Sequence, residues 1–316
     1  MRKLTIGMCC YDDYEGVFFT IQSLRMYHPE VMDQVEFVII DNHPNSKHGK
    51  LVKEFTGHIR QPFQYIPFDE YNATGIKNLI FEHAKTPYVM SIDCHVLIRP
   101  GAIKKLIEYY DQGLDKGNLL QGPLIHDCLS STSTFFNKKW GSHMMGQWDR
   151  NENLIDYDSE PFPINSQGMG LFSSRKENWL GYSPLFRGFG GEEQYIHDKY
   201  RKAGKEALCL PFLGWMHRFN RVNGVPYPNK LDERYRNYII GRMELDMDFD
   251  DVDENFKDTL SDEIRSSIKA EVAGLLGNKE VDIKAVAEAV ETPVQIKSKP
   301  TVNVADVIKR ARAQNS

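Results

Sequence analysis

A carboxylate and an imidazole stand two residues apart in the segment Ser91-Ile92-Asp93-Cys94-His95. At the end of a strand, side chains two positions apart point to the same side, so Asp93 and His95 can share one cation. Such a cation could hold a diphosphate group and offset the charge that grows on it when it leaves. The pattern also fits a strand-ending Asp that caps a turn beside an ordinary His, so both interpretations stay open here.

Two adjacent carboxylates end the glycine-rich segment 188–193 (GFGGEE), which precedes a predicted helix. Gly190 and Gly191 would let the backbone approach a ligand closely. The dipole of the helix favours the ionised forms of Glu192 and Glu193, which could then accept a proton or a sugar hydroxyl. A structural turn with acidic residues at a helix start fits the same letters.

His217, in the segment Trp215-Met216-His217-Arg218, is the third candidate. A single His is more often structural or exposed than a metal ligand. Its weight as a candidate comes from its combination with the other two segments.

The elements that must position these residues alternate between strands and helices in the first half of the chain. Apolar runs predict strands over residues 4–9, 35–40, 63–66 and 88–92, and helical patterns cover 17–27, 47–55 and 73–84. This alternation predicts a mostly parallel sheet with helices on both faces. Ligands of such sheets bind at the carboxyl ends of the strands, where Asp41 and Asp93 lie.

The second half of the chain is less regular. The aromatic- and Ser-rich stretch 130–148 fits either a mobile loop over a donor or an ordinary surface segment, whereas 192–203 has a helical apolar stripe. An acidic run over 244–254 marks a change in composition. We therefore predict a catalytic domain over 1–245 and a helical extension over 246–316. An amphipathic tail, with Val304, Val307, Ile308 and Ala311 on one stripe, would dock on the catalytic domain, a second copy or a partner. A frayed tail without function is the alternative.

The composition excludes several classes of protein. A formal net charge of −5 over 316 residues argues against a protein that coats nucleic acid by bulk electrostatics. The sequence shows neither a signal-peptide pattern nor a run of apolar residues long enough to span a membrane. The five cysteines are odd in number and form no C-x-x-C pair, which indicates reduced thiols in a cytoplasmic protein.

Taken together, and in this order, the three segments resemble a known family. Residues 168–219 are similar to the catalytic half of polypeptide N-acetylgalactosaminyltransferases, which show a G-G-L-F-S-like strand, then W-G-G-E at a helix start, then a G-H-x-F-R-like segment. The first half is similar to family 2 glycosyltransferases, through the Thr20–Leu24 helix segment, a V-I-I-D strand ending at Asp41, and Asn72 and Asn78. The resemblance covers residues 4–220 and implies an α/β fold of the GT-A (Rossmann-like) type.

The resemblance implies a metal-dependent hexosyl- or pentosyltransferase that uses a nucleotide sugar, with UDP as the expected nucleotide. Its cation would be held by Asp93, His95 and His217. A mixed set of carboxylate and imidazole ligands favours Mn²⁺ and leaves Mg²⁺ possible. The donor would be bound by Asp41, Asn72, Lys77, Asp93, Gly190 and Gly191.

The acidic pair departs from the family pattern. Glu192 would face the donor sugar or the acceptor, and Phe189 replaces the Trp of W-G-G-E. Glu193 stands where inverting galactosyltransferases carry the acid that serves as catalytic base. The stereochemistry of transfer therefore stays open.

Two other functions compete with glycosyl transfer. A nucleotide-sugar hydrolase would use the same cation and activate water through Glu193, and a non-catalytic sugar-nucleotide binder would need neither carboxylate. The acceptor is not specified by the sequence. A glycan, a protein and a hydroxylated base in modified DNA of the bacteriophage type are the alternatives.

Overall fold

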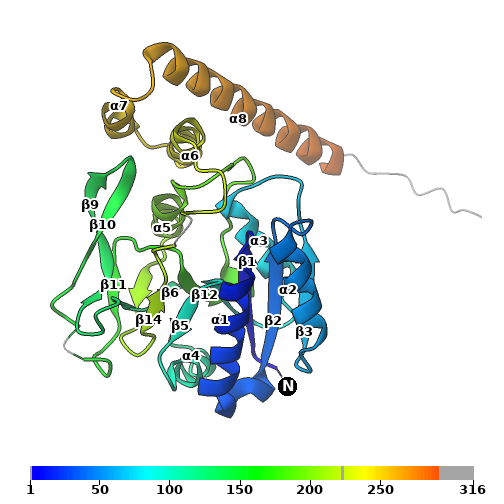
Figure 1. Ribbon diagram of the computed structural model, residues 1–316. Helices are drawn as coiled ribbons and strands as arrows, with labels where there is room; N and C mark the ends of the chain where they lie inside the picture. The colour runs from blue at the N-terminus through cyan, green and yellow to red at the C-terminus, as the bar shows by residue number, and fades with distance from the viewer. Residues whose placement is uncertain (1, 155, 222–223, 292–316) are drawn as a thin grey trace, which may run out of the picture. The chain divides into compact units, whose positions relative to one another are not determined.

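The computed structural model describes residues 2–154, 156–221 and 224–291, with side chains described as far as residue 277. Contacts divide the chain into two units, Met1–Val272 and Ala273–Ser316. The larger unit is built on an eight-stranded sheet in the order β11-β13-β6-β12-β4-β1-β2-β3 (Figure 1). Its strands are β1 (Leu4–Cys10), β2 (Val35–Asp41), β3 (Phe63–Pro67), β4 (Tyr88–Asp93), β6 (Leu119–Gln121), β11 (Phe162–Ile164), β12 (Leu171–Arg175) and β13 (Ala207–Cys209).

The sheet is mostly parallel, as predicted. β3, β2, β1 and β4 run parallel to one another, whereas β12 runs against both β4 and β6, and β11 runs against β13. Every residue of β2 is buried, which explains the nearly unbroken apolar run of its sequence. Cys9 pairs with Asp93 of β4 and Cys10 with Asp41 of β2, so the two aspartates flank the carboxyl end of β1.

Helices cover both faces of this sheet. On one face, α1 (Tyr14–Tyr27) and α4 (Ala102–Asp111) supply Val17, Ile21, Ile103 and Leu106 to the main hydrophobic core, and α2 (Lys47–Gly57) lies beside α1. On the other face, a short 3₁₀ turn η2 (Thr74–Lys77) leads into α3 (Asn78–His83), and α5 (Glu192–Lys202) follows later in the chain. A Cβ at Gly7 of β1 would lie 2.0 Å from Ile80, so this glycine permits the close packing of α3 on the sheet.

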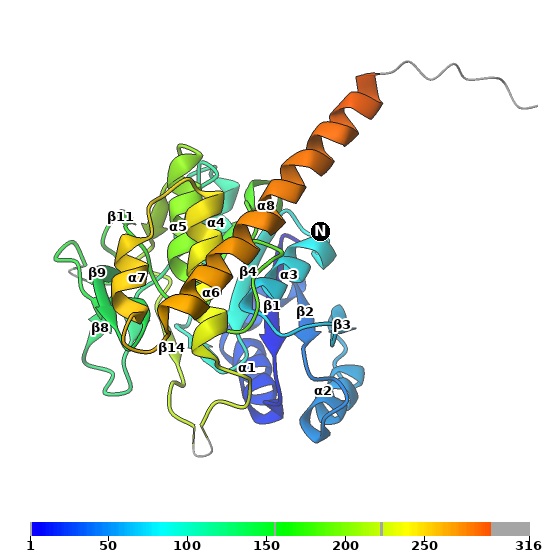
Figure 2. The same cartoon turned by 90° about the horizontal axis from the view of Figure 1, so that it is seen from above.

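The remaining strands form two smaller sheets. β14 (Trp215–His217) pairs with β5 (Val96–Ile98) in a small sheet that also contains β7 (Leu124–Ile125) and β8 (Thr132–Ser133). The stretch 130–148, for which the sequence leaves a mobile loop open, contains most of a hairpin of β9 (Phe135–Gly141) and β10 (Met144–Asp149). The hairpin lies on the side of the unit away from β3 in both views (Figures 1 and 2).

The compact unit extends past the predicted boundary at residue 245. After α6 (Leu231–Glu244), which packs on α5, come α7 (Asp250–Phe256) and α8 (Asp262–Glu291) (Figure 2). Val252 and Phe256 of α7 are fully buried, and the contacts place the end of the unit at Val272. The catalytic assignment of 1–245 stays a prediction, and the predicted tail stripe lies outside the described residues. Within the described ranges, no helix has the length and apolar character needed to cross a membrane.

Phe256 provides a test of whether α7 belongs to the core. Its ring lies 5.4 Å from that of Tyr235 and 5.0 Å from that of His143, centroid to centroid. Phe256→Ala is therefore expected to lower the free energy of unfolding by about 3–5 kcal/mol, measured by urea denaturation. Phe19→Ala is the matched control. Because Phe19 is 66% exposed, this substitution should change the free energy of unfolding little. Equal stabilities of the two variants would show that α7 is peripheral.

Candidate active site

A cavity of about 460 Å³ opens at the carboxyl ends of β1 and β4. η2, the start of α5 and the end of β14 complete its walls. Predicted site residues that line this cavity are Asn72, Lys77, Asp93, His95, Glu192, Glu193 and His217. The structure therefore brings together the three sequence segments that carry candidate chemistry.

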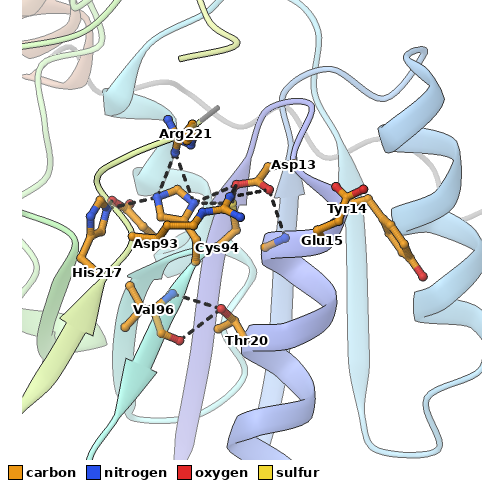
Figure 3. A network of polar contacts seen from close by, with 12 residues as sticks. Asp13, Tyr14, Glu15, Thr20, Asp93, Cys94, Val96, His217 and Arg221 are labelled. Carbon is orange, nitrogen blue, oxygen red and sulfur yellow. Dashed lines mark hydrogen bonds and ion pairs between the residues drawn. The ribbon is translucent and has the colours of Figure 1, made fainter. Parts of the chain in front are cut away.

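Asp93, His95 and His217 converge in this cavity, with one ligand atom of each within 4.8 Å of the others. Nε2 of His217 lies 3.1 Å from Nε2 of His95 and 3.3 Å from Oδ2 of Asp93. The pairing of strands explains this convergence, because His217 of β14 is opposite Val96 of β5, the residue after His95. Figure 3 shows Asp93 and His217 side by side in the network.

Lys77 is the cationic partner of Asp93. Its ammonium group donates to Oδ1 of Asp93 at 2.9 Å and to the carbonyl oxygen of Met169 at 2.7 Å, and the residue is 8% exposed. Burial alone would raise the pKa of Asp93, but Lys77 and then His217 outweigh it and hold that pKa well below its usual range. Asp93 is thus a carboxylate with Oδ1 bound to Lys77 and Oδ2 directed to the imidazoles.

The donor set fits a divalent cation. It offers one carboxylate oxygen and two imidazole nitrogens, a mixture that suits Mn²⁺ or Zn²⁺ better than the all-oxygen shell that Mg²⁺ prefers. Two ring nitrogens that face each other at 3.1 Å beside a carboxylate oxygen are also arranged as ligands of one ion would be.

Glu192 and Glu193 begin α5 on the cavity side and are 4% and 8% exposed. Burial raises the pKa of both side chains, and the negative charge of Glu192 raises that of Glu193 further. In the described part of the chain, Oε2 of Glu192 is buried and has no hydrogen-bond partner. The pair is therefore suited to hold a proton or to bind hydroxyl groups that enter the cavity.

Gly190 and Gly191 shape the start of α5. Their φ angles are 102° and 93°, in the left-handed region that favours glycine. A Cβ at Gly190 would lie 2.8 Å from Nε of Arg234 on α6, so these positions allow α5 and α6 to approach. They are not among the cavity-lining residues, although their neighbour Phe189 is. Their predicted contact with the donor stays a prediction.

Asp41 lies behind the cavity wall. It is fully buried, and its carboxylate accepts hydrogen bonds from the Tyr65 hydroxyl at 2.7 Å and from the backbone N–H of His43 at 3.0 Å. The next residue, Asn42, lines the cavity instead. Its side-chain NH₂ donates to the carbonyl oxygens of Phe68 and Tyr71, which fixes the amide. The predicted contact of Asp41 with the nucleotide stays a prediction.

Sequence reasoning missed the contact of Asp13 with His95 and left open whether the stretch 130–148 contributes to the site. Asp13 reaches His95 from the start of α1, and in the sequence it has only the signature of a helix cap. Aromatic side chains line the cavity near His217, including Phe136 and Trp148 of the hairpin and Phe219 after β14. The Phe219 ring lies 4.3 Å from the His217 ring, centroid to centroid. No motif in the sequence links the hairpin to this wall.

Fold and cavity define a class of protein: an α/β domain of the GT-A type, with a carboxylate–imidazole cluster and a pair of glutamates at the carboxyl ends of its strands. The model of glycosyl transferase family 2 matches residues 5–178, and the chain belongs to this family. It is thus a glycosyltransferase by family. None of the curated proteins compared with the chain matches it in sequence.

Solved structures share the fold. The structure of GalNAc-T7 with UDP, GalNAc and Mn²⁺ is similar over 82% of this chain and 54% of that one, at 13% identity and a TM-score of 0.62. The structure of S. aureus TarS 1-349 with UDP-GlcNAc is similar over 86% of this chain and 71% of that one, at 13% identity and a TM-score of 0.50. The chain thus spans about half the length of the GalNAc-T7 chain, and these likenesses concern the fold alone.

Proposed function

We propose that this protein transfers a sugar from a nucleotide-sugar donor to an acceptor hydroxyl and that it needs a divalent cation. The observation that carries the proposal is the convergence of Asp93, His95 and His217 in a cavity that also contains Glu192 and Glu193. UDP is the nucleotide we expect, because GalNAc-T7 was solved with UDP and TarS with UDP-GlcNAc.

A cation bound by Asp93, His95 and His217 would offset the negative charge of the diphosphate leaving group, and Mn²⁺ is the ion that we favour. Lys77 keeps Asp93 ionised and in place through the 2.9 Å ion pair. Glu192, with its unpartnered buried oxygen, would accept a hydrogen bond from a sugar hydroxyl. Glu193 would accept the proton of the attacking hydroxyl, and its raised pKa suits it to that task near neutral pH.

The acceptor is a glycan, a protein or a hydroxylated DNA base, and the proposal does not choose among them. Hydrolysis of the donor is the alternative activity, because Glu193 could deprotonate water as well as an acceptor hydroxyl. A non-catalytic binder would bind the donor without turnover.

Release of UDP from a panel of UDP-sugars tests the proposal. With Mn²⁺ present, we expect slow release without acceptor, faster release with the correct acceptor, and a product whose mass is increased by one sugar residue. Excess EDTA should stop release, and added Mn²⁺ should restore it. Full turnover in EDTA would contradict the metal requirement. Release that no acceptor accelerates would favour a hydrolase, and binding without release would favour a non-catalytic binder.

A further inference from the structure

Asp13 is the N-cap residue of α1 and lies three residues after the end of β1 at Cys10. Its Oδ1 accepts the backbone N–H of Gly16 at 3.0 Å, which is the hydrogen bond of a helix N-cap. The residue is 7% exposed. A cap alone requires only one carboxylate oxygen, but this carboxylate has further partners, and Figure 3 shows dashed lines that join Asp13 to its neighbours.

The first of these partners is His95. Oδ2 of Asp13 lies 2.9 Å from Nδ1 of His95, and both side chains are 8% exposed. Nη2 of Arg221 lies 3.0 Å from Nε2 and 3.3 Å from Nδ1 of His95, so the guanidinium group lies against the face of the ring. A carboxylate only accepts a hydrogen bond, so the contact with Oδ2 of Asp13 requires the His95 ring to carry a proton on Nδ1. This tautomer directs the lone pair of Nε2, which a cation would need, to the side of His217.

The second partner connects Asp13 to the other imidazole. Arg218 directly follows His217, and its Nη2 lies 2.9 Å and 2.8 Å from the two oxygens of Asp13. The backbone N–H of Arg218 also donates to the carbonyl oxygen of His95 at 3.2 Å. One carboxylate therefore links the start of α1, the turn after β4 and the end of β14.

We infer that Asp13 is a positioning residue of the cation site: it fixes the Nδ1–H tautomer of His95 and ties the segment of His217 to that of His95. Asp13, Cys94 and His95 lie close enough together to form a second possible ligand set. However, Asp13 already contacts Gly16 and Arg218, so we interpret Asp13 as an orienting group rather than a ligand. A carboxylate behind a ligating imidazole typically changes metal affinity by 10–100-fold when it is removed. The inference rests on the proposed function, because it assumes a cation at His95.

Asp13→Asn tests the inference, because Asn has the same shape and can still cap the helix. We expect the full-length variant to bind Mn²⁺ about 10–100-fold more weakly than the wild type in calorimetry without donor. In ¹⁵N-histidine spectra of the metal-free proteins, His95 should be protonated at Nδ1 in the wild type and lose that preference in the variant. A purely structural role would not shift the tautomer.

Ser46→Ala is the matched control. Ser46 caps α2 with the same geometry, since its Oγ accepts the backbone N–H of Gly49 at 2.9 Å, and it is not a cavity-lining residue. This variant should lose a cap yet keep the Mn²⁺ affinity and the His95 tautomer.

Wild-type affinity and an unchanged tautomer in Asp13→Asn would overturn the inference and leave Asp13 as a helix cap. Failure of the wild type to bind Mn²⁺ would contradict the proposed cation site itself. In that case the histidine spectra still decide whether Asp13 fixes the ring of His95.

Discussion

His217→Ala is expected to remove cation-dependent sugar transfer almost completely while the protein stays folded. The imidazole is one of the three proposed ligands, and a cation in such a site contributes several kcal/mol to the transition state. Because each ~1.36 kcal/mol changes a rate tenfold, we expect kcat to fall by about 10³-fold or more. UDP release and Mn²⁺ binding measured on the same preparation check this result.

His217 is a better target than Asp93 for this test. Asp93→Ala would leave the buried ammonium group of Lys77 without its ion-pair partner, and a buried charge without a partner destabilises the fold. Loss of activity in that variant could therefore reflect unfolding. His58→Ala, at an exposed position of the surface, is the control for histidine replacement. Unchanged turnover in His217→Ala would remove His217 from the ligand set.

Local sequence patterns were sufficient for the fold of the first half. The apolar run of β2 predicted a strand buried on both faces, and the strand spans Val35–Asp41. The expected helix over 17–27 begins three residues earlier at Tyr14, because Asp13 supplies the cap. The D-x-H spacing and the GFGGEE segment also led to residues that line one cavity, since both lie at the ends of elements whose type the sequence predicts.

What the sequence could not predict depends on contacts between distant segments. The pairing of β14 with β5 brings His217 to His95 across 122 residues, and no local pattern encodes that register. Asp13 looks like a cap because its contacts with His95 and Arg218 exist only in three dimensions. The acidic stretch 244–254 suggested a domain boundary, but Val252 and Phe256, four residues apart on α7, are fully buried within the unit that ends at Val272.

The second large expected effect on kcat comes from substitution in the acidic pair Glu192 and Glu193. Glu193→Gln is expected to lower kcat by about 10²–10⁴-fold with little change in donor binding, because an amide cannot accept the proton of the attacking hydroxyl. Glu192→Gln, one position away on the same helix, is the matched variant. Adjacent residues on a helix point about 100° apart, so the two carboxylates cannot address one atom equally. Glu192→Gln should instead weaken donor binding, measured as a higher Kd.

The charges around Glu193 predict how these effects depend on pH. Glu192 and burial raise its pKa, whereas Lys77 of η2 and Arg234 of α6 oppose the rise, and the neighbouring Tyr182 and Tyr238 stay neutral. As a base, Glu193 must be ionised, so kcat/KM of the wild type should rise with pH through a pKa above the ordinary value of about 4.3. This limb of the profile should be absent from the residual activity of Glu193→Gln.

Stability should show the opposite dependence on pH. A carboxyl group whose pKa is raised by folding binds its proton more tightly in the folded state. Its contribution to stability is therefore complete below its pKa in the unfolded chain, which is about 4.3. That contribution is lost as the pH rises through its pKa in the folded protein. Glu193→Gln cannot ionise and should therefore melt at a higher temperature than the wild type at pH 8, with the difference shrinking toward pH 4. A variant that is slower but more stable at pH 8 would identify Glu193 as a functional group kept at a cost to the fold. A variant that is less stable at every pH and unchanged in rate would show that the carboxylate serves the structure of the α5 N-terminus instead.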